Sequence, residues 1–166
     1  MIMNKKRFIK LGMFLVMVLC ICAGCSTNKE RKYTLDELDN LAQIEIYSAE
    51  NDELIKVIDD EEMLYRYNQC VLDGSYSEEE QEELEKSLEE IAEEYYLTTY
   101  KYPVARFSKG ELEKNTTITI YKDSNIVKMT VAEESIKAFS IPQEYLTFYY
   151  EVSEEDMEFY RSLIEE

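Results

Sequence analysis

Alternating apolar and polar residues between positions 41 and 58 predict two short β-strands. The four residues at positions 49–52, Ala-Glu-Asn-Asp, separate the two strands and are rich in residues that favour tight turns. The residues that share one face are Ala42, Ile44 and Ile46 in the first strand and Ile55 and Val57 in the second. The pattern therefore predicts a β-hairpin.

A helical pattern follows, with apolar residues three and four positions apart. Asp59 stands at its start, and Glu62 follows three residues later, as in a capping box. The apolar stripe comprises Met63, Tyr67, Cys70 and Val71. Asp-Gly at positions 73–74 is typical of a helix end, so the first helix is expected to stop there.

A second helical pattern begins behind Ser77, again with an acidic residue, Glu80, three positions on. Its apolar stripe comprises Leu84, Leu88, Ile91 and Tyr95. The helix is predicted to run to about Leu97, because Pro103 prevents it from continuing much further.

The remaining chain favours strands and one more helix. Residues 100–114 are compatible with either a short strand or a loop, and further strands are predicted at 116–121, 126–131, 136–141 and 145–152. Ser153 caps a terminal helix whose inward residues are Met157, Tyr160 and Ile164. The predicted fold class is α+β: an antiparallel sheet of four to six strands packed by three helices.

The first 24 residues are typical of a cleaved signal peptide. Four basic residues precede an apolar run at positions 11–23, and no acidic residue occurs before Cys25. A transmembrane helix is the alternative. Thirteen residues span only ~20 Å as a helix, against the ~30 Å of a hydrocarbon core, so export is the better interpretation.

The end of this segment resembles a lipobox, the cleavage motif of bacterial lipoproteins. The matching residues are Ala23, Gly24 and Cys25, whereas Cys22 replaces the usual leucine. The resemblance implies cleavage after Gly24 and a diacylglycerol with palmitate on Cys25, which anchors the chain at the extracytoplasmic face of the cell membrane. Two acyl chains suffice for stable anchoring. The predicted organisation is a signal peptide at 1–24, a lipidated cysteine and tether at 25–40, and a single α+β domain at 41–166.

Charge excludes one class of partner. Removal of residues 1–24 leaves 14 basic against 36 acidic residues, a net charge of −22. Such a chain repels phosphate backbones, so a nucleic-acid partner is not expected.

Residue types exclude several kinds of catalysis. The chain has no His, so Ser-His-Asp triads, Cys-His pairs and His-ligated metals are ruled out, and no catalytic residue, metal site or cofactor is predicted. Cys70 is the one cysteine left after export and lipidation, and it is expected to be structural. Ten glutamates between positions 78 and 94 indicate a solvated helix face, with weak Ca²⁺ association as the alternative.

Tyrosine is unusually abundant, with 14 residues. In the predicted strand 145–152, Tyr145 and Tyr149 lie on the face opposite the expected core residues Leu146, Phe148, Tyr150 and Val152. Tyr145 and Tyr149 are therefore candidate partner-binding residues, since exposed tyrosines often anchor interfaces. Ordinary ring pairing between strands is the alternative.

The order of the predicted elements resembles a family of small Gram-positive lipoproteins whose domain has no assigned function. The resemblance covers the architecture of residues 42–165, with residues 75–100 as an insertion, and it implies a location without an activity. The function expected is a non-enzymatic binding module that recognises an envelope protein or peptide. The alternatives are a carboxylate-based hydrolase of cell-wall polymer and a weak divalent-cation binder.

Overall fold

The computed structural model describes residues 32–165 apart from 71, 73–75, 104–110 and 137–140. The signal peptide, the cleavage site at Gly24 and the predicted lipid attachment at Cys25 lie outside the described residues, as does most of the strand predicted at 136–141. The compact unit that the described residues form begins at Lys32. No helix in the described part of the chain is long and apolar enough to cross a membrane.

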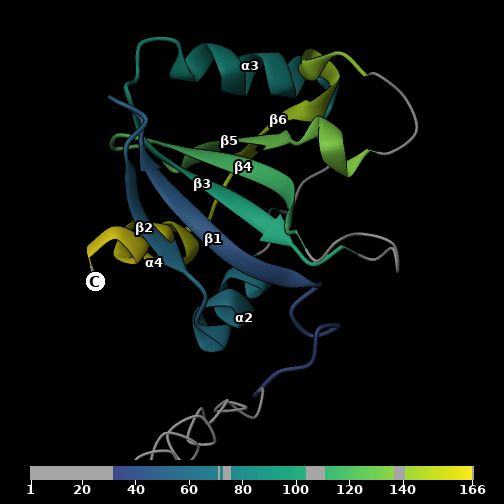
Figure 1. Cartoon of the computed structure of the whole chain (residues 1–166). Coiled ribbons are helices and arrows are strands. Elements are labelled where there is room, and N and C mark those ends of the chain that lie inside the picture. Colours follow the sequence, from purple (N-terminus) through teal and green to yellow (C-terminus); the bar gives the residue numbers. More distant parts are fainter. Residues whose placement is uncertain (1–31, 71, 73–75, 104–110, 137–140, 166) are drawn as a thin grey trace, which may run out of the picture. The chain divides into compact units, whose positions relative to one another are not determined.

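Six antiparallel strands form one open sheet in the order β2-β1-β3-β4-β5-β6 (Figure 1). The strands are β1 (Leu41–Ser48), β2 (Leu54–Ile58), β3 (Glu93–Lys101), β4 (Glu113–Tyr121), β5 (Ile126–Val131) and β6 (Thr147–Glu151). The helices are α2 (Glu61–Gln69), α3 (Glu78–Leu88) and α4 (Glu154–Glu165), with single 3-10 turns η1 (Glu133–Ser135) and η2 (Gln143–Leu146). The predicted α+β fold class is confirmed.

The hydrophobic core lies on one face of the sheet. Its strand residues are at most 5% exposed and include Ile44, Ile46, Ile58, Leu97, Ile118, Ile120 and Val127. Leu64 of α2 and Met157, Tyr160 and Leu163 of α4 join the same cluster. Burial of each large aliphatic side chain stabilises the fold by about 1.5–3 kcal/mol, so this face carries most of the folding free energy.

The opposite face of the sheet is polar, and α3 lies on that side, across the sheet from α2 and α4 (Figure 1). Threonines on neighbouring strands pair across it: the hydroxyls of Thr98 and Thr117 lie 3.3 Å apart, and Thr130 and Thr147 lie 3.4 Å apart. Such cross-strand pairs support a sheet without a second apolar core. One face of the sheet therefore carries the hydrophobic core, and the other face carries polar side chains.

The helix predicted from Ser77 to Leu97 is wrong in its second half. It ends at Leu88, and residues from Glu93 onward form β3, the strand between β1 and β4. Residues 95–100 are aromatic or β-branched except Leu97, and such residues suit a pleated surface. Pairing with strands on both sides overrides the helical spacing of Ile91 and Tyr95.

Three smaller predictions are also corrected. Ile55 and Val57 are 45% and 46% exposed. Val57 pairs with Glu45 on the polar face of the sheet, whereas Ile58 pairs with the core residue Ile44 and provides the buried side chain of β2. The first helix is capped by Asp60 and not by Asp59: its carboxylate accepts the N–H groups of Glu62 and Met63. Residues 143–146 form the η2 turn, so the last strand begins at Thr147.

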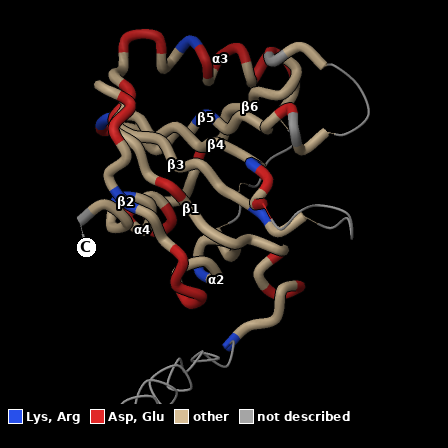
Figure 2. Tube along the Cα trace, viewed as in Figure 1, with Lys and Arg blue, Asp and Glu red and all other residues tan. Residues whose placement is uncertain are grey.

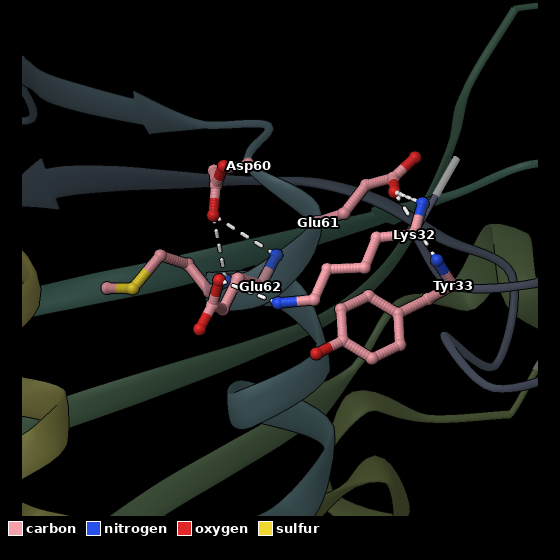
Figure 3. Close-up of polar contacts among 6 residues, drawn as sticks. Lys32, Tyr33, Asp60, Glu61 and Glu62 are labelled. Carbon is pink, nitrogen blue, oxygen red and sulfur yellow. Dashed lines mark hydrogen bonds and ion pairs between the residues drawn. The ribbon is translucent and has the colours of Figure 1, made fainter. Parts of the chain in front are cut away.

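The first described residues are held against the start of α2 (Figure 3). The backbone N–H of Lys32 donates to the Glu61 carboxylate at 2.6 Å, and the Lys32 amine lies 3.0 Å from Glu62. The ring of Tyr33 stacks on Tyr65 with centroids 4.3 Å apart. The chain is thus attached to the fold before residue 41, where the sequence pattern places the start of the domain.

Candidate functional site

A groove of about 780 Å³ lies between α3 and the edge strand β6 with its η2 turn. Its aromatic lining comprises Tyr76, Tyr145, Phe148, Tyr149 and Tyr150, and its acidic lining comprises Glu78, Glu82, Glu85 and Glu144. Gln81 and Thr147 complete the lining. The volume falls within the range of small-ligand sites, and the mixture of rings with a few polar groups is typical of them.

A capping box fixes the start of α3 and therefore one wall of the groove. The Ser77 hydroxyl accepts the Glu80 N–H at 3.3 Å, and the Glu80 carboxylate accepts the Ser77 N–H at 2.7 Å. The backbone hydrogen bond from Ser77 lowers the pKa of Glu80 below its ordinary value, and the Ser77 hydroxyl adds to this effect. The predicted Ser77–Glu80 cap is confirmed.

Gln81 joins α3 to the sheet. Its side-chain amide donates to the carbonyl of Tyr149 at 2.8 Å and accepts the N–H of Tyr149 at 2.7 Å. Both of these backbone groups belong to the outer side of β6, where no strand within the described ranges pairs. The helix is consequently held at a fixed height above the edge strand, and the groove is preformed.

The floor of the groove is aromatic. The rings of Tyr76 and Tyr150 meet edge to face, with centroids 6.2 Å apart. The Tyr149 hydroxyl donates to Glu85 at 3.0 Å, and burial, followed by this hydrogen bond, raises the pKa of Tyr149 above its ordinary value. Tyr145 is 67% exposed, so its ring is available to a ligand.

The rim of the groove is acidic, as the row of acidic positions along α3 illustrates (Figure 2). Glu78, Glu82, Glu85 and Glu144 are all exposed, and among the described residues that line the groove none is Lys or Arg. Lys86, the basic residue of α3, lies 3.5 Å from the Glu82 carboxylate on the solvent side. The site therefore offers negative charge next to polarisable ring faces.

Both tyrosines predicted to bind a partner line this groove, although they come from different elements. Tyr149 is in β6, whereas Tyr145 is in η2, so the predicted shared strand face is replaced by two adjoining elements on one side of the groove. Phe148, assigned to the core from its alternation, is 37% exposed and also lines the groove. Side chains from both faces of β6 reach the hollow because β6 is an edge strand.

Tyr76, Gln81 and the glutamates were not identified as site residues from sequence. Glu78, Glu82 and Glu85 recur at intervals of four and three positions, which places them on one helix face. That periodicity was a usable signal. Gln81 had no such signal, since an isolated glutamine on a polar helix face is ordinary.

Cys70 is a separate feature at the end of α2. Its thiol donates to the carbonyl of Arg66 at 3.6 Å. Burial raises the pKa of the Cys70 thiol to about 12, and the nearby Asp156 carboxylate adds to this effect. Within the described ranges no group of three or more acidic or cysteine side chains is placed to hold a metal ion.

Comparison of the chain with models of protein families, with curated protein sequences and with solved structures found no match.

Proposed function

We propose that the protein is a lipid-anchored binding module at the extracytoplasmic face of the cell membrane, and that it holds its partner in the groove between α3 and β6. The carrying observation is the preformed groove itself, which unites Tyr145 and Tyr149 beside a row of glutamates. Gln81 holds its two walls together, so little ordering is needed when a partner binds.

The anchoring part of the proposal rests on the sequence. A basic start, an apolar run and the residues Ala23, Gly24 and Cys25 are the features of an exported lipoprotein. The strongly acidic mature chain agrees with a module that stands off from anionic headgroups. Lipid on Cys25 then acts as the attachment, and the folded unit acts as the receptor.

Hydrolysis by paired carboxylates is the second candidate, favoured by the four glutamates that line one groove. A carboxylic acid that donates a proton near neutral pH needs a buried or strongly apolar setting to raise its pKa. Glu78, Glu82, Glu85 and Glu144 are exposed, which favours binding over catalysis. Release of soluble fragments from purified cell wall by the wild-type chain, abolished in Glu85→Gln, would reverse this preference.

Site-specific photo-crosslinking tests the proposed binding role in the living cell. A photoreactive phenylalanine analogue replaces Tyr145 in the groove or, as the control, Tyr102, which is 37% exposed and lies outside the groove. Irradiation is expected to yield a discrete adduct from position 145 and none from position 102. Absence of an adduct at position 145 with normal protein levels, or the same adduct from both positions, would contradict the proposal.

A further inference from the structure

We infer that the occupant of the groove is an extended peptide segment of a partner protein whose alternate side chains are Lys or Arg. This inference rests on the proposed function and names the chemistry of its ligand. It is carried by four properties of the groove: its charge, its aromatic floor, the spacing of its glutamates and the blocked edge of β6.

Charge selects a cation. In the part of the chain that the structure describes, the lining of the groove presents four glutamates and no Lys or Arg. A mature net charge of −22 adds a long-range field that attracts cations and repels anions before contact. An anionic or phosphorylated ligand would meet repulsion at every point of the rim.

The aromatic floor selects an organic cation. An ammonium or guanidinium group gains about 0.5–2 kcal/mol over the face of an aromatic ring, depending on its exposure to solvent. Lys and Arg also carry apolar stems that cover ring surface while the charged ends reach the carboxylates. Tyr145 and Phe148 provide exposed ring surface beside Glu144 and Glu82. A bare metal ion would use the carboxylates and leave this surface uncovered.

The spacing along α3 suits an extended chain. Glu78, Glu82 and Glu85 are four and three residues apart, so their Cα atoms rise along the helix by about 6 Å and about 4.5 Å. Side chains on one side of an extended peptide recur every ~6.7 Å. The flexible stems of Glu and Lys absorb the difference. Basic residues at alternate positions of a peptide can therefore each meet a glutamate.

Gln81 determines which part of such a peptide the groove can recognise. Because its amide occupies both the N–H and the C=O of Tyr149, a peptide cannot pair with β6 as a seventh strand at that position. Recognition then depends on the side chains of the peptide and not on its backbone. The order of basic and small residues becomes the specificity determinant, in contrast to ordinary strand addition.

A peptide-binding assay tests the inference. The full chain, purified in a non-ionic detergent, is titrated against a fluorescent pentapeptide Lys-Thr-Lys-Thr-Lys and against the same peptide with norleucine in place of lysine. We expect the lysine peptide to bind at least about tenfold more tightly, since the norleucine side chain keeps the stem and removes the charge. Equal affinities for the two peptides would overturn the inference.

Two matched double variants locate the binding. Glu78→Gln/Glu82→Gln removes two charges from the groove, whereas Glu79→Gln/Glu83→Gln removes two charges from the same turns of α3 outside it. The first is expected to weaken binding at least about fivefold and the second less than about twofold. Equal weakening would show that diffuse negative charge binds the peptide, which contradicts a groove site.

Competition with spermidine separates a peptide from a free polyamine. Spermidine carries similarly spaced amines, and we expect it to compete at least about tenfold less well than the pentapeptide, because its single short chain covers less of the aromatic floor than three lysine stems do. A polyamine that binds as tightly as the peptide would contradict the inference that the groove holds a peptide segment. If the pentapeptide fails to bind while position 145 still forms an adduct in cells, the ligand chemistry is wrong and the binding function stands.

Discussion

Gln81 and Tyr149 form a two-point junction in which a helix side chain replaces a missing neighbour strand. The amide of Gln81 donates to the carbonyl of Tyr149 at 2.8 Å and accepts its N–H at 2.7 Å. An edge strand normally leaves such groups to water or to another chain. Here one glutamine satisfies them and sets the width of the groove.

Replacing Gln81 with Ala should lower the free energy of unfolding by about 1–3 kcal/mol, since two hydrogen bonds worth about 0.5–1.5 kcal/mol each are lost. Urea denaturation measures the loss, and hydrogen exchange of the Tyr149 amide should become faster. Glu83→Ala, on the same helix outside the groove, is the control and should change stability by less than about 0.5 kcal/mol. An unchanged exchange rate at Tyr149 in the Gln81→Ala variant would contradict the junction.

Acid should loosen the start of α3 through Glu80. Because hydrogen bonds from Ser77 lower the pKa of Glu80, its stabilising effect is present above its ordinary pKa of 4.5 and is lost as the pH falls through its lowered value in the fold. Glu80→Gln keeps the capping box but cannot be protonated. Between about pH 5 and pH 3 we expect the variant to lose less stability than the wild type, with Glu79→Gln as the control. Identical pH profiles for Glu80→Gln and the wild type would rule out this contribution.

Cys70 should be nearly inert toward thiol reagents in the folded protein. With its pKa raised from 9.0 to about 12, the thiolate fraction near neutral pH is about a thousandfold below that of an unperturbed thiol. Alkylation by iodoacetamide, followed by mass spectrometry of the peptide that contains Cys70, should show labelling only after unfolding in urea. Rapid labelling of the folded chain would mean that the thiol is more exposed and more acidic than the fold implies.

The ring of Tyr33 should contribute to the stability of the folded unit. Tyr33→Ala removes the stack on Tyr65, whose centroids are 4.3 Å apart, and should cost about 1 kcal/mol or more. Tyr145→Ala is the matched control, because that ring is 67% exposed and should change stability by less than about 0.5 kcal/mol. Thermal or urea unfolding distinguishes the two. Equal effects would mean that the stack of Tyr33 on Tyr65 adds nothing measurable to the stability of the fold.

Cys25→Ala should abolish acylation. The thiol of Cys25 is the proposed attachment point for diacylglycerol, so metabolic labelling with palmitate should be lost and the uncleaved precursor should accumulate. Cys22→Ala tests the neighbouring departure from the lipobox and should leave labelling in place. Palmitate that persists in Cys25→Ala would refute the anchor.

Local patterns predicted those elements whose propensity and packing agree. The hairpin around residues 49–52 and the terminal helix behind Ser153 appear as expected, because their turn and capping residues act locally. The prediction of helix at 89–97 was wrong because the apolar residues there fit helical spacing by position but are mostly aromatic or β-branched by type. Only the neighbouring strands β1 and β4, distant in sequence, decide between the two.

Local sequence patterns also predicted part of the candidate site. Tyr145 and Tyr149 could be named because alternation assigned them to the solvent side of a strand. The groove itself could not be named, since it depends on α3 lying beside β6, and that arrangement depends on Gln81, a residue with no distinctive pattern around it. Contacts between residues that are distant in sequence and individually ordinary cannot be predicted from the pattern of a single sequence.

The hydrogen bonds from Gln81 to the backbone of Tyr149 also limit how copies of this protein can pair through their sheets. β2 forms the other edge of the sheet, where Leu54, Ile55 and Val57 are about half exposed, whereas β6 is closed at Tyr149 by Gln81. A chain with two open edges can polymerise head to tail into a fibre, but a chain with one open edge can only pair β2 with β2 and stop. Any pairing of copies through their sheet edges is therefore expected to stop at a dimer, because the Gln81 amide already occupies the outward backbone groups of Tyr149.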